Sequence, residues 1–296
     1  MKRLFLTSVV LLLVFMAQAQ TKIAPKLVKG YKAVYTEEMT VNVAGNDMVK
    51  LTSETEYTVS DVTADGAMIT VKTVNVTDNS DGGNPMSSIL SASMKMMEGV
   101  DMKVKTNADG QVQGIVNFEE VQAQVKKMSK NLIDKIYESS PELAQMLPRE
   151  GLESQMLEKM DADLILASLR NTGVLSLNGK TISNGATDSY ENEEGFKMKR
   201  MFFVAGKNII VNSTLNMSKD ELKTLIIKQV EEQAPEQAEM IKQNIDMVMD
   251  QMKFEVTGKS TFTMQDNGWV KSVKTEASQE AMGQSTKSVT VTTLKQ

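Results

Sequence analysis

The sequence contains neither cysteine nor histidine among its 296 residues, and these two absences exclude most familiar catalytic and metal-binding sites. Without cysteine there can be no disulfide, no thiolate nucleophile and no zinc site of the usual Cys/His kind. Without histidine there can be no Ser-His-Asp triad and no imidazole base. The spacing of the 38 acidic residues marks none of them as a catalytic pair. We therefore expect a protein that is not an enzyme and that holds no metal and no other cofactor.

Basic residues are outnumbered by acidic ones, 33 against 38, so the formal net charge is −5. A general nucleic-acid binder carries a basic face, and the chain has no basic cluster with interleaved aromatic residues. The composition therefore indicates that nucleic acid is not a partner. A net negative charge is the common solubilising state and identifies no other partner.

Long apolar runs are absent except at the N-terminus, where the pattern is typical of a cleavable secretory signal peptide. Two basic residues precede an apolar stretch at residues 4–16, and the triplet Ala17-Gln18-Ala19 places small residues at the positions that signal peptidase inspects. The apolar stretch is shorter than the roughly 20 residues that a membrane-spanning helix needs. The sequence predicts cleavage between Ala19 and Gln20 and export of a soluble protein, without a transmembrane segment, to the periplasm or the extracellular space.

Alternation of apolar and polar residues, the period of a half-buried strand, recurs near both ends of the chain. Strands are expected at residues 31–43, 49–59, 67–76, 102–106, 111–116, 197–204, 208–217, 253–264, 269–276 and 285–294. Short Asn, Asp and Gly segments separate many of these runs, and such residues suit tight hairpin connections. The sequence therefore predicts antiparallel pairing, with the first three strands as a meander.

Helical periodicity occupies the segments between these strands, at residues 86–98, 117–136, 153–169 and 218–252. Strands and helices come in blocks and do not alternate, which favours the α+β fold class. We expect a curved antiparallel sheet of roughly 8–10 strands packed against helices from two insertions, residues 117–172 and 218–252. In this scheme the signal peptide, residues 1–19, precedes a single domain that spans residues 20–296.

Several short segments resemble a family of exported bacterial proteins that is known only as a domain of unknown function. They are Lys29-Gly30-Tyr31, Tyr57-Thr58-Val59-Ser60-Asp61-Val62, Ala64-Asp65-Gly66 and the closing series of strands at 253–294. The resemblance covers residues 27–128 and 252–295, and the family brings no activity or binding residues with it. The expected fold is also similar in outline to lipoprotein-carrier folds that hold acyl chains, which is an analogy of fold alone.

Methionine is unusually frequent, with 23 residues, while the chain has one tryptophan and eight phenylalanines. Flexible thioether side chains fill irregular gaps in a core, and they also repack around apolar ligands. Residues that are candidates to line an apolar cavity between sheet and helices are Met86, Ile89, Leu90, Met94, Met97, Met240, Met247 and Met249. Copper binding is disfavoured, because successive methionines on a helix diverge by about 100° and cannot all face one ion.

Two functions therefore stay open. In the first, the exported protein binds an apolar small molecule, such as a lipid, in a methionine-rich cavity between sheet and helices. In the second, it is a non-catalytic interaction or scaffold protein of the cell envelope with a fully packed core. The presence or absence of an apolar cavity between the sheet and the helices distinguishes them.

Overall fold

The fold is known from a computed structural model. It describes residues 20–80, 85–139, 149, 161–192, 195–233, 239–240, 242–246, 249, 254–281 and 284–295. The predicted signal peptide lies outside these residues. Parts of both predicted helical insertions, including residues 150–160 and 250–252, lie outside them as well.

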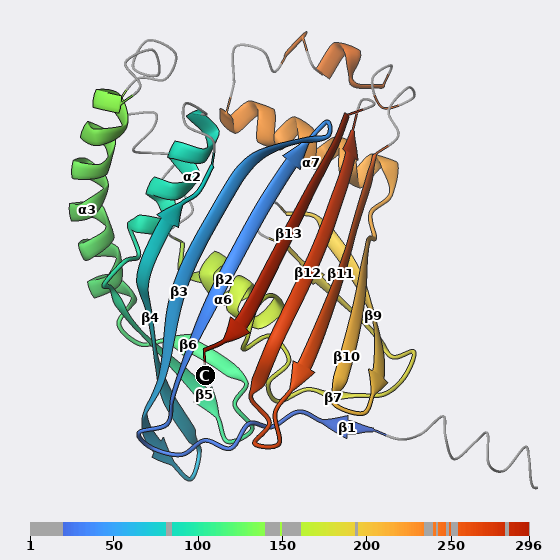
Figure 1. Ribbon diagram of the computed structural model, residues 1–296. Helices are drawn as coiled ribbons and strands as arrows, with labels where there is room; N and C mark the ends of the chain where they lie inside the picture. Colours follow the sequence, from blue (N-terminus) through green and yellow to red (C-terminus); the bar gives the residue numbers. More distant parts are fainter. Residues whose placement is uncertain are drawn as a thin grey trace, which may run out of the picture.

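One 11-stranded antiparallel sheet dominates the molecule (Figure 1). In spatial order its strands are β6 (Val112–Ile115), β5 (Asp101–Asn107), β4 (Gly66–Asp78), β3 (Asn46–Thr63), β2 (Lys32–Val43), β13 (Gln284–Leu294), β12 (Val270–Ala281), β11 (Glu255–Met264), β10 (Asn208–Leu215), β9 (Lys197–Ala205) and β8 (Thr187–Glu191). Two further strands, β1 (Thr21–Lys22) and β7 (Thr181–Ile182), pair in a small sheet of their own.

The sheet consists of two meanders, β2 to β6 and β8 to β13, that meet where β2 pairs with β13. The predicted meander of the first three strands is confirmed by β2, β3 and β4. The joining ladder runs from Val43 opposite Thr286 to Tyr35 opposite Leu294, so the first and the last strand of this sheet in sequence lie side by side in its middle.

The predicted α+β class with about 8–10 strands is wrong, because the fold is mostly β. In the part of the chain that the structure describes, strands hold nearly twice as many residues as helices. Apolar periodicity missed strand β8 (TDSYE) and ended β12 too early, at residue 276 and not at Ala281. Both segments are dominated by polar residues, and threonine and serine in them pair in the ladder without contributing an apolar stripe.

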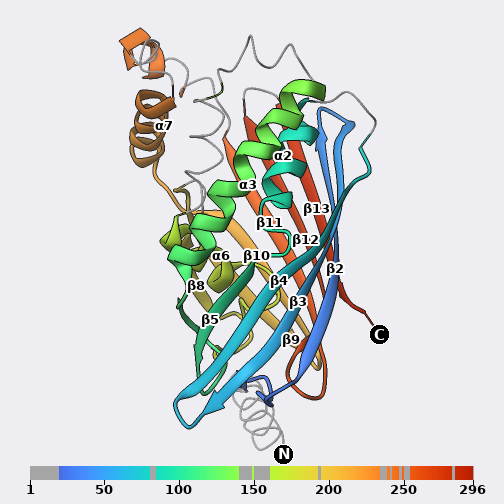
Figure 2. The same cartoon turned by 90° about the vertical axis from the view of Figure 1, so that its left-hand side faces the viewer.

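The helices are α2 (Pro85–Lys95), α3 (Phe118–Ser139), α6 (Ala162–Asn171) and α7 (Lys219–Gln233). Figures 1 and 2 show α2, α3 and α6 on the concave side of the curved sheet, while α7 lies toward the end away from β1. Contacts of α2 with β3 and β4 and of α6 with β6 fix these placements. We call the face that carries the helices the inner face.

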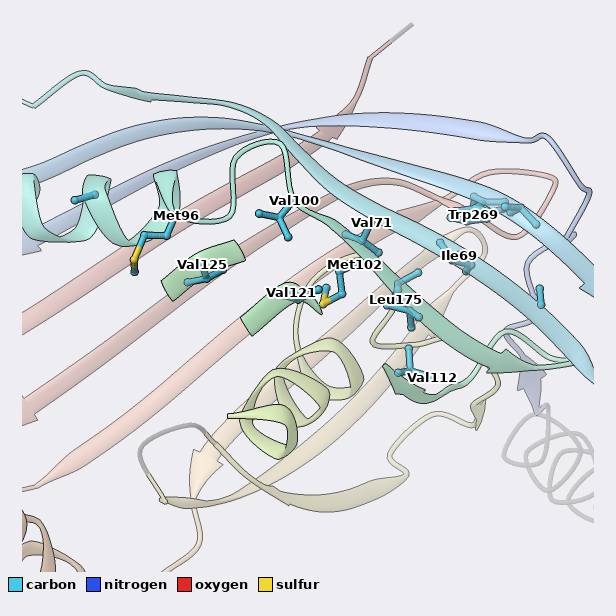
Figure 3. Close-up of a cluster of buried hydrophobic side chains, with 14 of the residues drawn as sticks. Ile69, Val71, Met96, Val100, Met102, Val112, Val121, Val125, Leu175 and Trp269 are labelled. Atoms are coloured by element: carbon cyan, nitrogen blue, oxygen red, sulfur yellow. The ribbon is translucent and has the colours of Figure 1, made fainter. Parts of the chain in front are cut away.

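The largest core cluster lies where α2 and α3 cover the inner face of β3 to β6. Figure 3 shows side chains from these elements gathered in this interior. Its labelled members are Ile69, Val71, Met96, Val100, Met102, Val112, Val121, Val125, Leu175 and Trp269. A second cluster covers the inner face of β9 to β12, and a third packs α7, Ile245 and Met249 on the start of β9.

The N-terminal segment closes the end of the sheet at which β1 lies. Trp269, in the turn before β12, is 1% exposed and donates its indole N–H to the carbonyl oxygen of Lys26 at 3.2 Å. Its ring lies 5.0 Å from the ring of Tyr31, centroid to centroid. The preceding residue must be glycine, because Gly268 has φ +80° and a Cβ there would lie 2.5 Å from the carbonyl oxygen of Ala24.

Candidate ligand-binding site

Helix α6 bridges the two meanders beside the edge strand β6. Its Arg170 donates from Nε to the carbonyl oxygen of Val112 at 3.1 Å and from Nη2 to that of Gln113 at 2.8 Å. At the other side, the carbonyl oxygen of Asn171 accepts a hydrogen bond of 3.4 Å from Nη1 of Arg200 on β9. The end of α6 is therefore tied both to the free edge of the first meander and to the second meander.

The sequence sets both ends of α6. Asp161 is the N-cap, since its Oδ1 accepts from the backbone N–H groups of Asp163 at 2.8 Å and Leu164 at 3.2 Å. After Thr172, Gly173 has φ +70° and turns the chain back toward the sheet. The predicted helix at residues 153–169 thus has its second half confirmed, while its first half lies outside the described residues.

A cavity of about 290 Å³ lies between the C-terminal half of α6, the loop that follows it and the inner face of β8 to β12. Its apolar side chains come from Leu177, Tyr190, Met198, Val211, Val256 and Phe262. Its smaller and polar residues are Ala167, Ser168, Asn171, Thr172, Gly173, Ser176, Glu191, Asn192, Arg200, Ser213, Thr257, Gly258, Ser260, Thr275 and Ala277. The cavity is small but close to the range of about 300–1,000 Å³ of small-molecule sites.

A row of small residues across three neighbouring strands makes this hollow. Ser213 on β10 lies opposite Gly258 on β11, and Gly258 lies opposite Ala277 on β12. Residues opposite each other in a ladder point to the same face of the sheet. Because these inward positions carry almost no side-chain volume, the space between the sheet and α6 is left open there.

Arg200 is a charged residue of the cavity wall, and it is only 5% exposed. Its Nε and Nη2 donate to the two carboxylate oxygens of Asp188 at 2.6 and 2.8 Å, a bidentate pair. Nζ of Lys180 contacts the same carboxylate at 3.1 Å. The guanidinium carbon lies 4.3 Å from the ring centroid of Tyr190, so the ring and the ion pair hold the guanidinium plane in place.

The pKa values in this cluster show that two cations compete for one carboxylate. Burial raises the pKa of Asp188, but hydrogen bonds and charges from Arg200 and Lys180 outweigh burial and hold the pKa below its usual value. Burial lowers the pKa of Lys180, and the neighbouring positive charge of Arg200 lowers it further, against the opposing effect of Asp188. The cluster therefore carries one positive charge in excess when all three groups are ionised.

Comparisons with known proteins give no family for this chain. No family model and no curated protein matches it. Among solved structures it is similar to lipovitellin, in a study of lipid–protein interactions, with a TM-score of 0.42 and 11% identity over 92% of this chain and 26% of that one. A porin-like protein from Bacteroides uniformis gives a TM-score of 0.18 and 8% identity over 90% and 96% of the two chains. The chain spans about a quarter of lipovitellin, and both TM-scores are too low to show a common fold.

The residues predicted to line a methionine-rich cavity do not come together in the described part of the chain. Ile89, Leu90 and Met94 are half-buried on α2, and Met97 packs on the first core cluster. Met249 is buried in the third cluster, and Met240 is 61% exposed. The side chain of Met86 and the whole of Met247 lie outside the described residues. None of the described six lines the cavity beneath α6, whereas Met198, which the sequence did not single out, does.

Sequence reasoning also missed Arg200 and Asp188, although one signal for Arg200 was present. In β9 the inward positions are Met198, Arg200 and Phe202, so an arginine occupies a position of apolar parity between two buried residues. A charged residue at such a position is almost never buried without a partner. Asp188 lies in the polar strand β8, where no pattern marks it.

The described residues contain no group of three or more acidic side chains arranged to hold a metal ion. They also include no helix with the length and apolar character that a bilayer crossing requires.

Proposed function

We propose that this protein binds a small apolar or amphipathic molecule in the cavity beneath α6, as a carrier or sequestering protein without catalysis. The observation that carries the proposal is the hollow between the row Ser213, Gly258 and Ala277 and the end of α6, walled by apolar side chains. Release of apolar ligand surface from water contributes about 25 cal/mol per Å² to binding. The N-terminal pattern adds the proposal that the protein acts outside the cytoplasm.

The size of the cavity limits the ligand. One water molecule takes about 30 Å³ of the liquid, so a cavity of about 290 Å³ has room for roughly ten non-hydrogen atoms. A single ten-carbon chain is of this size, whereas a lipid with two long chains would have to extend beyond the cavity. A scaffold protein with a fully packed core, the other function left open by the sequence, does not account for this hollow.

A cavity-filling variant tests the proposal. Isothermal titration calorimetry with 1-decanol is expected to show saturable binding of one molecule per chain. Ala277→Leu places a larger side chain in the hollow and should abolish the signal. Ala205→Leu is the matched control, because Ala205 is exposed at the end of β9 outside the cavity. The proposal fails if the unsubstituted chain shows no saturable binding of 1-decanol or of any charged ten-carbon amphiphile, or if both variants bind 1-decanol as the unsubstituted chain does.

A further inference from the structure

We infer that the ligand of this cavity carries an acidic head group and that Arg200 and Ser213 bind that group. The inference rests on the proposed function and adds to it a chemical class, a single-chain amphiphile with a carboxylate or phosphate head. Its basis is the buried guanidinium group of Arg200 in the cavity wall, because the carboxylate that pairs with it, Asp188, is shared with Lys180.

The charge of Arg200 is only partly neutralised. Asp188 is the carboxylate within reach of its guanidinium, and Asp188 is shared with Lys180 at 3.1 Å. The cavity wall also contains Glu191, but this side chain is exposed and its negative charge acts on Lys197. A buried positive charge in excess of its counter-charge is costly, and a ligand that brings one negative charge removes that cost.

The guanidinium also has donors to spare on the side away from Asp188. Nε and Nη2 are engaged by the carboxylate, whereas Nη1 makes one long hydrogen bond, 3.4 Å, to the carbonyl oxygen of Asn171. An arginine has five N–H donors in all, and Nη1 carries two of them. At least one donor is therefore free for a ligand oxygen.

Ser213 supplies an independent observation at the same place. It lies directly opposite Arg200 in the ladder between β9 and β10, and both residues line the cavity. Within the described part of the chain its hydroxyl group has no hydrogen-bond partner, whereas the hydroxyl groups of Ser260 and Thr275, which also line the cavity, bond to each other at 3.0 Å. A free hydroxyl beside a partly neutralised guanidinium is a suitable pair of donors for an acid group.

A series of probes of equal chain length tests the inference on the unsubstituted protein. Calorimetry at pH 7.5 compares decanoate and decyl phosphate with 1-decanol and decylammonium. A charge-assisted hydrogen bond favours an acid by about 1.5–3 kcal/mol, so at least one acid should bind roughly 10- to 150-fold more tightly than 1-decanol. Decylammonium should bind most weakly. The tighter of the two acids identifies whether the head group is a carboxylate or a phosphate.

The outcomes separate the two proposals. Equal affinity for the acids and 1-decanol overturns the inference and leaves the proposed function standing. Absence of saturable binding by every probe overturns the proposed function itself. Tighter binding of decylammonium than of either acid also overturns the inference, because the cavity would then prefer a positively charged head group.

Variants of the ion pair distinguish recognition from a merely structural role. Arg200→Met should weaken the binding of decanoate at least tenfold, whereas Asp188→Asn should strengthen it, because it removes the carboxylate that competes with the ligand. Neither should change the affinity for 1-decanol by more than a few-fold. Arg200→Lys should restore part of the loss. Lys199→Met, on the exposed outer face of β9, is the control for loss of one positive charge.

A purely structural pair predicts a different pattern. Removal of either partner would then loosen the wall and weaken all probes together, and Asp188→Asn would not gain affinity for decanoate. Circular dichroism of each variant checks that the sheet is retained. If the variants do not fold, the probe series on the unsubstituted protein still decides the inference.

Discussion

Truncation of Trp269 to alanine should cost the protein a large part of its stability, because this side chain joins the N-terminal segment to the first core cluster. The ring is 1% exposed, it lies against Tyr31 at 5.0 Å, and its N–H group binds the carbonyl oxygen of Lys26. Removal of a buried tryptophan costs about 3–5 kcal/mol, and native domains are stable by only about 5–15 kcal/mol. We expect a decrease of about 4 kcal/mol in the free energy of unfolding.

Trp269→Phe separates the contribution of packing from that of the hydrogen bond. Phenylalanine keeps most of the ring and loses the donor to Lys26, whose side chain is exposed, so water can reach that carbonyl group in part. The expected cost is about 1–2 kcal/mol. Urea unfolding followed by circular dichroism measures both variants, since the single tryptophan is lost as a fluorescent probe. A cost below about 1 kcal/mol for Trp269→Ala would refute the role of this contact in closing the sheet.

Three further changes test other features of the fold. Arg170→Met removes both hydrogen bonds to the edge of β6 and should cost about 1–2 kcal/mol in urea unfolding, with faster hydrogen exchange in α6; unchanged exchange would contradict the bridging role. Gly66→Ala should cost more than about 3 kcal/mol, because φ is +154° and the new Cβ would lie 1.9 Å from a carbonyl oxygen on β5. Hydrogen bonds from Lys197 and Ser218 lower the pKa of Glu221 from 4.5 to about 2, so its contribution to the cap of α7 is complete above pH 4.5 and lost as the pH falls toward 2. An NMR titration of that carboxyl group should find this midpoint, and Ser218→Ala should raise it.

The strands of the first meander could be predicted because each has one apolar and one polar face. β2, β3 and β4 alternate clearly, and turn residues such as Gly66 separate them. The segment Ser218-Lys219-Asp220-Glu221 has the sequence of a capping box, and the hydroxyl group of Ser218 accepts from the backbone N–H of Glu221 at 3.2 Å. Strand alternation, turn residues and helix caps each depend on a few neighbouring residues, so one stretch of sequence is enough to predict them.

The cavity could not be predicted because its cause is not local. Ser213, Gly258 and Ala277 lie far apart in the sequence and become neighbours only through the registers of two ladders. When the strand registers are unknown, a small inward-facing residue in one strand does not reveal a cavity, because its neighbours across the sheet are unknown. The high methionine content suggested a different cavity, but methionines such as Met96 and Met249 fill core clusters.

The ladder between β2 and β13 determines when the sheet can become continuous during synthesis. Glu37 on β2 accepts a hydrogen bond from Thr292 on β13, a residue 255 positions later in the sequence. At about 5–20 residues per second, synthesis of the 255 residues between these two positions takes roughly 10–50 s. During this time β2 is an open sheet edge, which is a template for pairing with other chains. The adjacent charges of Glu37 and Glu38 on that strand oppose such association until the last strand arrives.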